Sequence, residues 1–193
     1  MIAYKFLAQG AVSPFTGFRW PGPGEWVGAP AGRDDAWVHA CRPADLPYWL
    51  DDELWRVELG EPVRAARYQV AAPQARLVSR IVGWDPALGR DYARACALRA
   101  RDLALSQLTP ALRGALDGLD DLQAIADAVQ GTRAASMAAG YVSDGAHNAL
   151  HVGPATTSYI ACVLASTLGG GLAAFEAERA WQARWLADRL GLE

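Results

Sequence analysis

The chain has 193 residues, a formal net charge of −3 and 52% hydrophobic residues. This length suits one domain with a substantial core or two small domains, and the composition excludes a disordered chain. Basic and acidic residues are spread evenly over the two halves. Because neither half carries a basic field, we expect neither nucleic acid nor an anionic membrane as a partner.

Three cysteines stand far apart, at positions 41, 96 and 162. An odd number at wide spacing does not fit a disulfide framework and favours a reducing compartment. The first residues lack the basic region and long apolar run of a signal peptide. The most apolar window, Tyr159–Phe175, is interrupted by polar residues and three glycines, so we expect it to be too short and too broken to span a bilayer. The sequence therefore predicts a cytoplasmic protein.

The first predicted element is a strand over Ala3–Leu7. Its alternation places Tyr4 and Phe6 inward and Lys5 outward. Lys5 is the only lysine of the chain, and every other basic side chain is an arginine.

The next segment, Gly10–Trp26, reads GAVSPFTGFRWPGPGEW. Its glycines and prolines exclude a helix, and its aromatic residues make it too apolar for a free linker. One interpretation is a loop that its aromatic side chains attach to the core. The other is an aromatic-lined ligand groove, in which Trp20 contacts the ligand and Arg19 binds an anion or stacks on a ring.

A turn is predicted at 29–35, followed by a strand over Trp37–Cys41. The alternation of this strand places Trp37, His39 and Cys41 on one face. A nucleophilic Cys41 requires a lowered pKa and access to solvent, whereas a buried cysteine on a strand is a small apolar side chain. His39 and Cys41 are therefore candidates both for a ligand site and for the core.

A short helix is expected to begin at Pro43, because proline suits the first helical turn and Asp45 is favoured there by the helix dipole. Tyr48 belongs to its apolar cover. A strand is expected over Leu54–Leu59. The acidic run 51–53 and the later Glu58 either supply a carboxylate for acid–base chemistry or a ribose hydroxyl, or form a solvated face.

Two further strands are predicted at 67–72 and 76–84, separated by Pro73. Asp85 followed by Pro86 is a helix-start signal, and from there the chain is alanine-rich and helical. Helices are expected at 87–107, from Thr109 through Gln130, and at 132–150, 155–168 and 172–190. The predicted fold class is α+β: a small, mostly antiparallel β unit at 1–84, followed by a helical bundle at 85–193.

His147 and His151 lie four apart on a predicted helix, so both imidazoles share a face and could hold a metal ion. Further ligands would have to come from His39, Cys41 or Asp144. The alternative is a pair of surface or capping histidines near the helix end.

The segments AYKFL, GFRW, WVHACRPADLPYWL and ELWRVELGE together resemble an uncharacterised bacterial and phage domain family with a G-F-H-A-C-type core. The resemblance covers about residues 3–84, with Trp-Val in place of Gly-Phe before His39. The order of elements is also similar to part of an ADP-ribosyltransferase core. That similarity implies a nucleotide surrounded by Arg19, His39, Tyr48 and Glu58, with Glu61 as the other candidate glutamate.

The sequence therefore predicts a non-enzymatic binding or interaction module whose partner is a protein or a small molecule, and it leaves a homo-oligomer open. The alternative is an NAD-using enzyme on an ADP-ribosyltransferase-like scaffold. A metal protein based on His147 and His151 is the third hypothesis. The cofactor stays unknown from the sequence, and NAD belongs only to the alternative hypothesis.

Overall fold

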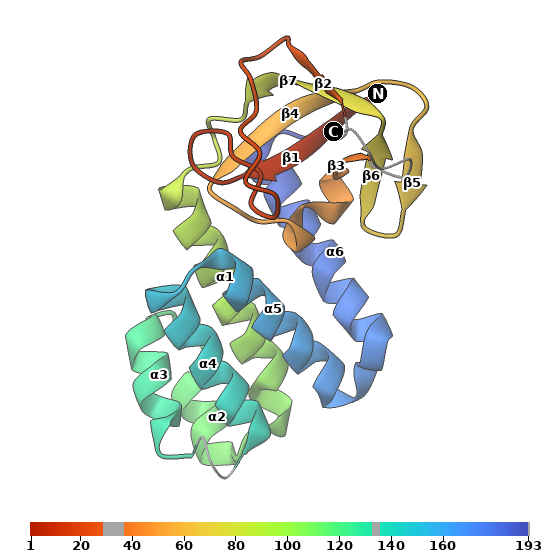
Figure 1. Ribbon diagram of the computed structural model, residues 1–193. Coiled ribbons are helices and arrows are strands. Elements are labelled where there is room, and N and C mark those ends of the chain that lie inside the picture. Colours follow the sequence, from red (N-terminus) through yellow and green to blue (C-terminus); the bar gives the residue numbers. More distant parts are fainter. Residues whose placement is uncertain (29–36, 133–135, 193) are drawn as a thin grey trace. The chain divides into compact units, whose positions relative to one another are not determined.

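The computed structural model describes residues 1–28, 37–132 and 136–192. The chain divides into two compact units, one formed by Met1–Pro86 with Leu186–Glu193 and the other by Ala87–Trp185. Strands occupy the first unit and helices the second, which confirms the predicted α+β class (Figure 1). The boundary after Pro86 lies close to the predicted one. The end of the last helix groups with the β unit, whereas the sequence placed it in the bundle.

The larger sheet contains four antiparallel strands in the order β1-β4-β7-β2. Their bounds are Ile2–Leu7 for β1, Glu53–Leu59 for β4, Gln74–Arg80 for β7 and Trp26–Gly28 for β2. β4 therefore lies inside the sheet. Its side chains alternate as predicted, since Val57 and Leu59 are buried and Arg56 is exposed. The pairing of β4 with β7 contains a bulge between Arg56 and Val57.

The smaller sheet contains three antiparallel strands in the order β3-β6-β5. These are β3 at Val38–Ala40, β6 at Gln69–Ala72 and β5 at Arg64–Ala66. The two sheets are joined where Tyr4 N donates to Cys41 O over 2.8 Å and Cys41 N donates to Tyr4 O over 2.7 Å. This bridge sets β3 beside β1 (Figure 1).

Both faces of β1 are covered. Ala3 and Leu7 belong to the core cluster of the β unit, together with Val57. Tyr4 and Phe6 are buried on the opposite face, where Phe6 meets Trp84 edge to face at 5.3 Å between ring centroids. The prediction that Lys5 points outward is therefore wrong: by the period of two, Lys5 shares the face of Ala3 and Leu7.

A short 3-10 helix, η1 at Pro43–Tyr48, connects β3 to β4. It begins at the predicted proline, but the role of Asp45 goes beyond the helix dipole. The Asp45 carboxylate is buried and accepts hydrogen bonds from the backbone and the guanidinium of Arg42. A second guanidinium contact joins Arg42 to the Ala66 carbonyl at 3.1 Å, so this pair attaches the helix start to β5.

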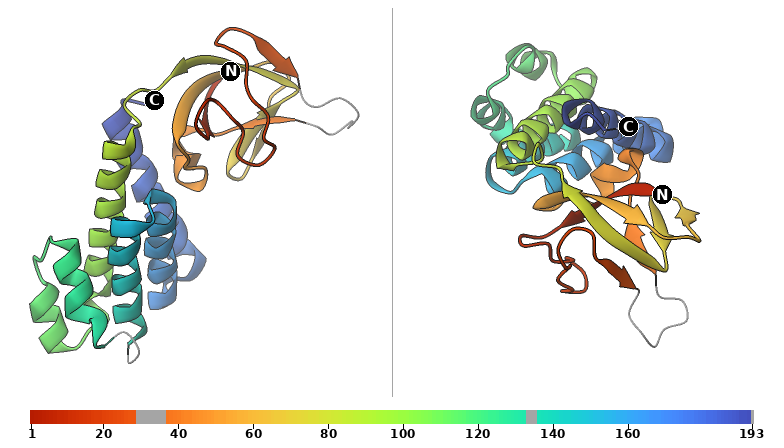
Figure 2. Two further views of the ribbon diagram at one scale, coloured as in Figure 1. Left: turned by 60° about the vertical axis from the view of Figure 1, so that its left-hand side comes forward. Right: turned by 90° about the horizontal axis from the view of Figure 1, so that it is seen from above.

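The second unit consists of helices. They are α1 at Pro86–Ala104, α2 at Pro110–Leu116, α3 at Leu122–Gln130, α4 at Met137–His151, α5 at Pro154–Ala165 and α6 at Gly171–Leu190, with a 3-10 turn, η2, at Leu105–Gln107. Within this unit α3, α4 and α5 pack in sequence order (Figure 2).

Local signals explain most of the helix ends. α1 and α2 begin at the predicted prolines, and the Thr109 side chain accepts from Leu112 N. The segment predicted to continue from Thr109 to Gln130 is two helices instead. Gly118 takes a φ of 70°, which ends the first, and Asp121 caps the second by accepting from Ala124 N.

Two predictions fall on residues outside the description. The turn predicted at 29–35 lies there entirely. So does the stretch 133–135 at the start of the helix predicted for 132–150, whose described part is α4.

Small residues let the helices approach one another closely, as the alanine-rich sequence indicates. A Cβ on Gly145 of α4 would lie 3.7 Å from the Ala100 side chain of α1. α6 covers part of the same bundle: Trp185 lies 5.4 Å from Tyr92 between ring centroids. Buried Gln182 donates to the Ser158 carbonyl at 2.9 Å and accepts from Arg179 at 3.0 Å.

One helical stretch, Pro154–Leu190, is long and apolar enough to cross a membrane by length and composition, with a mean hydropathy of 1.6 in its most apolar window. Within this stretch α5 and α6 meet at the glycines that the sequence predicts to interrupt it. The backbone leaves helical geometry between the two helices, at Gly169, where φ is 106°, and at Gly171, where φ is 54°. Buried core helices of water-soluble proteins also satisfy this test.

Candidate functional site

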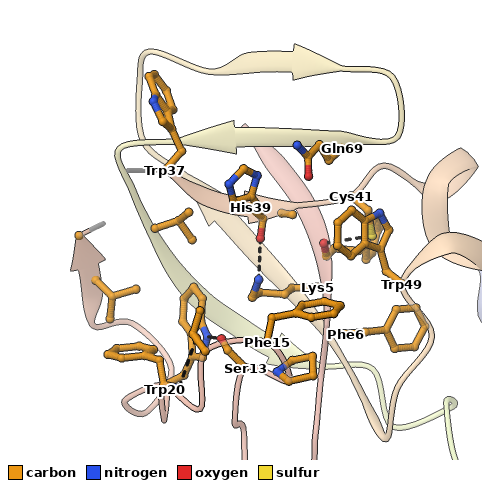
Figure 3. A pocket seen from close by; sticks show the side chains of 18 residues that line it. Lys5, Phe6, Ser13, Phe15, Trp20, Trp37, His39, Cys41, Trp49 and Gln69 are labelled. Atoms are coloured by element: carbon orange, nitrogen blue, oxygen red, sulfur yellow. Dashed lines mark hydrogen bonds between the residues drawn. The ribbon is translucent and has the colours of Figure 1, made fainter. Parts of the chain in front are cut away.

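A pocket of about 520 Å³ opens in the β unit where the two sheets meet. Its volume falls within the roughly 300–1,000 Å³ typical of small-molecule sites. Seven of its lining residues are aromatic: Tyr4, Phe6, Phe15, Phe18, Trp20, Trp37 and Trp49. They come from β1, the loop that follows it, the position before β3 and the segment after η1. Figure 3 shows five of them, Phe6, Phe15, Trp20, Trp37 and Trp49, among the side chains around the pocket.

β3 forms one side of the pocket. Trp37, His39 and Cys41 all line it, together with Val38 and Ala40 between them. The β3–β6 pairing sets His39 opposite Ala71, and Gln69 of β6 also lines the pocket.

The loop after β1 forms the opposite side and folds back on itself. Trp20 N donates to Ala11 O over 2.9 Å, and the Trp20 indole donates to Ser13 Oγ over 2.9 Å. Trp20 is 6% exposed and belongs to the β-unit core. Phe15, at the tip of the loop, is 84% exposed. Trp20 therefore attaches the loop to the core and also lines the pocket, and the ligand groove stays a prediction.

The acidic run holds the start of this loop. The Glu53 carboxylate accepts from Gly10 N at 3.1 Å, from Ala11 N at 3.2 Å and from the Trp55 indole at 3.0 Å. Burial alone would raise the pKa of Glu53, but these hydrogen bonds and the charge of Arg80 outweigh it and lower the pKa. The buried carboxylate of Glu53 is thus part of the loop's support, neither a solvated face nor a group on the pocket wall.

Trp49 closes the end of the pocket next to η1. Its indole donates to the Tyr68 carbonyl over 2.7 Å, and its ring meets Phe15 edge to face at 6.3 Å between centroids. Tyr48 lies one residue earlier and stacks on Tyr68 at 4.1 Å. η1 therefore positions Trp49 in the pocket wall, while Tyr48 packs outside it.

Lys5 is the charged centre of the pocket. Its ammonium donates to the His39 carbonyl over 2.7 Å and lies 5.7 Å from the centre of the Trp20 ring. Burial lowers the pKa of Lys5 to about 8, and Cys41 opposes this shift to a smaller extent. No aspartate or glutamate is found among the described residues that line the pocket.

The neighbours of Lys5 respond to the same environment. Burial raises the pKa of the Cys41 thiol to about 12, and the thiol donates to the Tyr4 carbonyl over 3.3 Å. Partial burial and the charge of Lys5 lower the pKa of His39. At neutral pH the pocket thus presents a protonated thiol and a neutral imidazole.

The sequence candidates separate into two groups. Trp20, His39 and Cys41 line the pocket together. Arg19 instead donates to the Gly10 carbonyl at 2.9 Å within the loop, and Glu58 forms an ion pair with Arg76 at 2.7 Å. With Tyr48 packed on Tyr68, His39 is the one member of the proposed nucleotide set that lines this pocket.

The two histidines of α4 lie together, as their spacing predicts, with 4.8 Å between ring centroids. His147 and His151 are both on the exposed side of α4. Among the described residues there is no group of three or more histidine, cysteine or acidic side chains placed to hold a metal ion.

Sequence reasoning did not select Lys5, Trp37, Trp49 or Gln69 as site residues. One signal for Lys5 was present, because it is the single lysine in a chain that otherwise uses arginine. Trp49 comes to the pocket through η1, and Gln69 through the pairing of β6 with β3. Neither contact has a signal in local sequence spacing.

Comparison of the chain with protein-family models, with curated proteins and with solved structures gave no significant match. The resemblance to a bacterial and phage domain family, and the ADP-ribosyltransferase-like analogy, therefore stay predictions.

Proposed function

We propose that this protein is a binding module for a small, planar, largely apolar molecule, held in the pocket between β1, β3 and the loop after β1. The observation that carries the proposal is the concentration of aromatic side chains around a cavity of ligand size. Planar ligands stack on such side chains, and buried apolar area drives their binding.

The state of the polar groups in the pocket supports binding over covalent chemistry at Cys41. A cysteine nucleophile acts as its thiolate, whereas burial keeps the Cys41 thiol protonated at neutral pH. His39, Gln69 and Ser13 then supply hydrogen bonds that orient a ligand. Such a small number of polar groups in an aromatic pocket is typical of ligand sites.

Indole N–H signals in a proton–nitrogen correlation spectrum test this proposal. Naphthamide, a neutral planar probe, should shift the signals of Trp20, Trp37 and Trp49, which line the pocket. The signals of Trp181 and Trp185 in α6 should stay in place. Absence of any indole shift at millimolar probe, or a shift confined to α6, would contradict the proposal.

A pair of tryptophan variants provides the control. Trp37→Ala removes a lining ring and is expected to weaken probe binding about tenfold, which is the order of one stacking contact. Trp26→Ala removes an exposed ring that lies on β2 and packs against Arg76. Binding should be unchanged in this second variant.

The NAD-using enzyme remains the alternative proposal, and the same spectra test it. A ligand at 100 times its dissociation constant stabilises a folded protein by about 2.7 kcal/mol. Thermal stabilisation by NAD, with shifts at Trp20 and Trp37, would favour the alternative. Stabilisation by naphthamide and none by millimolar NAD would favour the binding module.

A further inference from the structure

Lys5 places one positive charge inside an aromatic pocket. The described residues that line the pocket include Lys5 and no carboxylate. Two titratable side chains of the wall that interact electrostatically with Lys5 are His39 in β3 and Cys41 just after it. They are neutral at pH 7 because the pKa of the imidazole is lowered and that of the thiol is raised. A ligand with a single negative charge would therefore meet one uncompensated cation.

The geometry leaves the ammonium able to bind such a ligand. An ammonium has three N–H donors, and among the described residues its partner is the His39 carbonyl at 2.7 Å. Figure 3 shows Lys5 between Phe15 and Trp20 of the loop and His39 of β3. Donors remain for an acceptor that enters along the aromatic side chains.

We propose that the ligand of this pocket is an aromatic carboxylate, whose ring packs among Trp20, Trp37 and Phe15 and whose carboxylate binds the Lys5 ammonium. This inference rests on the proposed binding function and adds the chemical class of the ligand. A carboxylate brings one charge to match one ammonium. A phosphate monoester would bring nearly two negative charges, and the second would be desolvated against apolar side chains.

The identity of residue 5 agrees with this assignment. Arginine supplies every other cation of the chain. An arginine fork is larger and spreads its donors in a plane, whereas a lysine ammonium is a compact charge that fits beside the His39 carbonyl and a carboxylate at once.

Naphthoate and naphthamide form the matched test pair, since they differ in the charge of the head group and little in shape. With the indole shifts as the readout, naphthoate should bind wild-type protein about tenfold more tightly or better, the order expected of a charge-assisted hydrogen bond. Equal affinities would overturn the carboxylate assignment and leave the binding module standing. No indole shift with either probe would contradict the binding module itself.

Two variants test whether the ammonium of Lys5 causes the preference for naphthoate. Lys5→Met keeps the chain length and removes the ammonium, so it should bind the two probes equally. Arg56→Met removes an exposed cation of β4, and the preference for naphthoate should persist in it. A preference that survives in Lys5→Met would overturn the proposal.

The wild-type protein alone gives an independent test, which applies even if Lys5→Met does not fold. The pKa of Lys5 is about 8, so the preference for naphthoate should hold below this pH and shrink above it as the amine loses its charge. Naphthyl phosphate is the third probe. Tighter binding of the phosphate than of the carboxylate, or a naphthoate preference constant with pH, would overturn the assignment.

Discussion

The ammonium of Lys5 donates a hydrogen bond to the carbonyl oxygen of His39 over 2.7 Å, and so joins the first strand of the larger sheet to the edge strand of the smaller one. The contact lies next to the backbone bridge between Tyr4 and Cys41. The same group therefore contributes to the junction of the sheets and to the charge of the pocket.

The ionisation of Lys5 can be measured directly, because the chain contains no other lysine. Nitrogen NMR of protein labelled at lysine should give one side-chain signal, with a titration midpoint near 8 where an exposed lysine titrates near 10.5. A midpoint at the ordinary value would show that the ammonium is fully hydrated, and would contradict the burial described.

The lowered pKa of Lys5 also makes the free energy of unfolding depend on pH. Because the pKa of Lys5 is lower in the folded protein, the unfolded chain binds more protons between about pH 8 and 10.5. This group therefore makes the free energy of unfolding rise with pH across that window. The buried thiols contribute the opposite slope, since burial raises their pKa. The measurable quantity is the difference between wild-type and Lys5→Met protein in denaturant unfolding, which should grow with pH in favour of the wild type.

Glu53→Gln should loosen the loop after β1. The carboxylate accepts two backbone amides and an indole, and a neutral amide replaces charged acceptors with weaker ones. We expect a loss of about 1–3 kcal/mol in denaturant unfolding. Glu25→Gln, at an exposed position of the same loop, should change the stability by less than about 0.5 kcal/mol.

Protonation of Glu53 at low pH should destabilise the wild-type protein in the same way as the Glu53→Gln substitution. The pKa of Glu53 is lowered from 4.5 in the folded protein, so its contribution is complete above that value and is lost as pH falls through the folded pKa. Stability of Glu53→Gln should be less sensitive to acid over this range. Identical acid profiles of the variant and the wild type would refute the role assigned to Glu53.

All three thiols should be unreactive in the folded protein. Cys41, Cys96 and Cys162 are at most 1% exposed, and burial raises the pKa of Cys41 to about 12 and that of Cys162 to about 11. A thiol reagent at pH 8 should label no cysteine before denaturant is added, and three afterwards. Rapid labelling of Cys41 in the folded protein would restore the hypothesis of a nucleophile at this position.

Gln182→Leu should destabilise the helical unit. Gln182 is fully buried, donates to the Ser158 carbonyl and accepts from Arg179. Leucine would leave a buried carbonyl and a buried guanidinium each short of a hydrogen bond, at a cost of about 2–4 kcal/mol. Arg184→Met, at an exposed position of the same helix, is the control and should leave the thermal midpoint nearly unchanged.

Periodicity predicted the strands that are buried on one side. The alternation of β4 gave its buried side, with Val57 and Leu59 buried and Arg56 exposed. The short strands β2 and β5 were missed because their residues are mostly exposed, so no alternation of apolar and polar side chains marks them. β7, which pairs with β2, is distant from it in the sequence. β6, which pairs with β5, follows it after a turn.

The orientation of Lys5 could not be obtained from its own strand. The alternation was correct in period, but a charged residue was assigned to solvent on chemical type alone. The space that Lys5 enters exists because a second sheet and a folded loop cover that face of β1. These contacts, like that of Trp49, come from tertiary packing. The separation of Arg19, Tyr48 and Glu58 from the pocket follows from the same packing.

The loop that carries Phe15 and Trp20 is closed by its own hydrogen bonds and is held at its start by the carboxylate of Glu53 through main-chain amides. Such a support does not depend on which side chains the tip bears. Residues 14–16 could thus be exchanged for others while the strands and the half-buried Lys5 keep their places. Libraries built at these positions should yield receptors with altered selectivity on an unchanged frame.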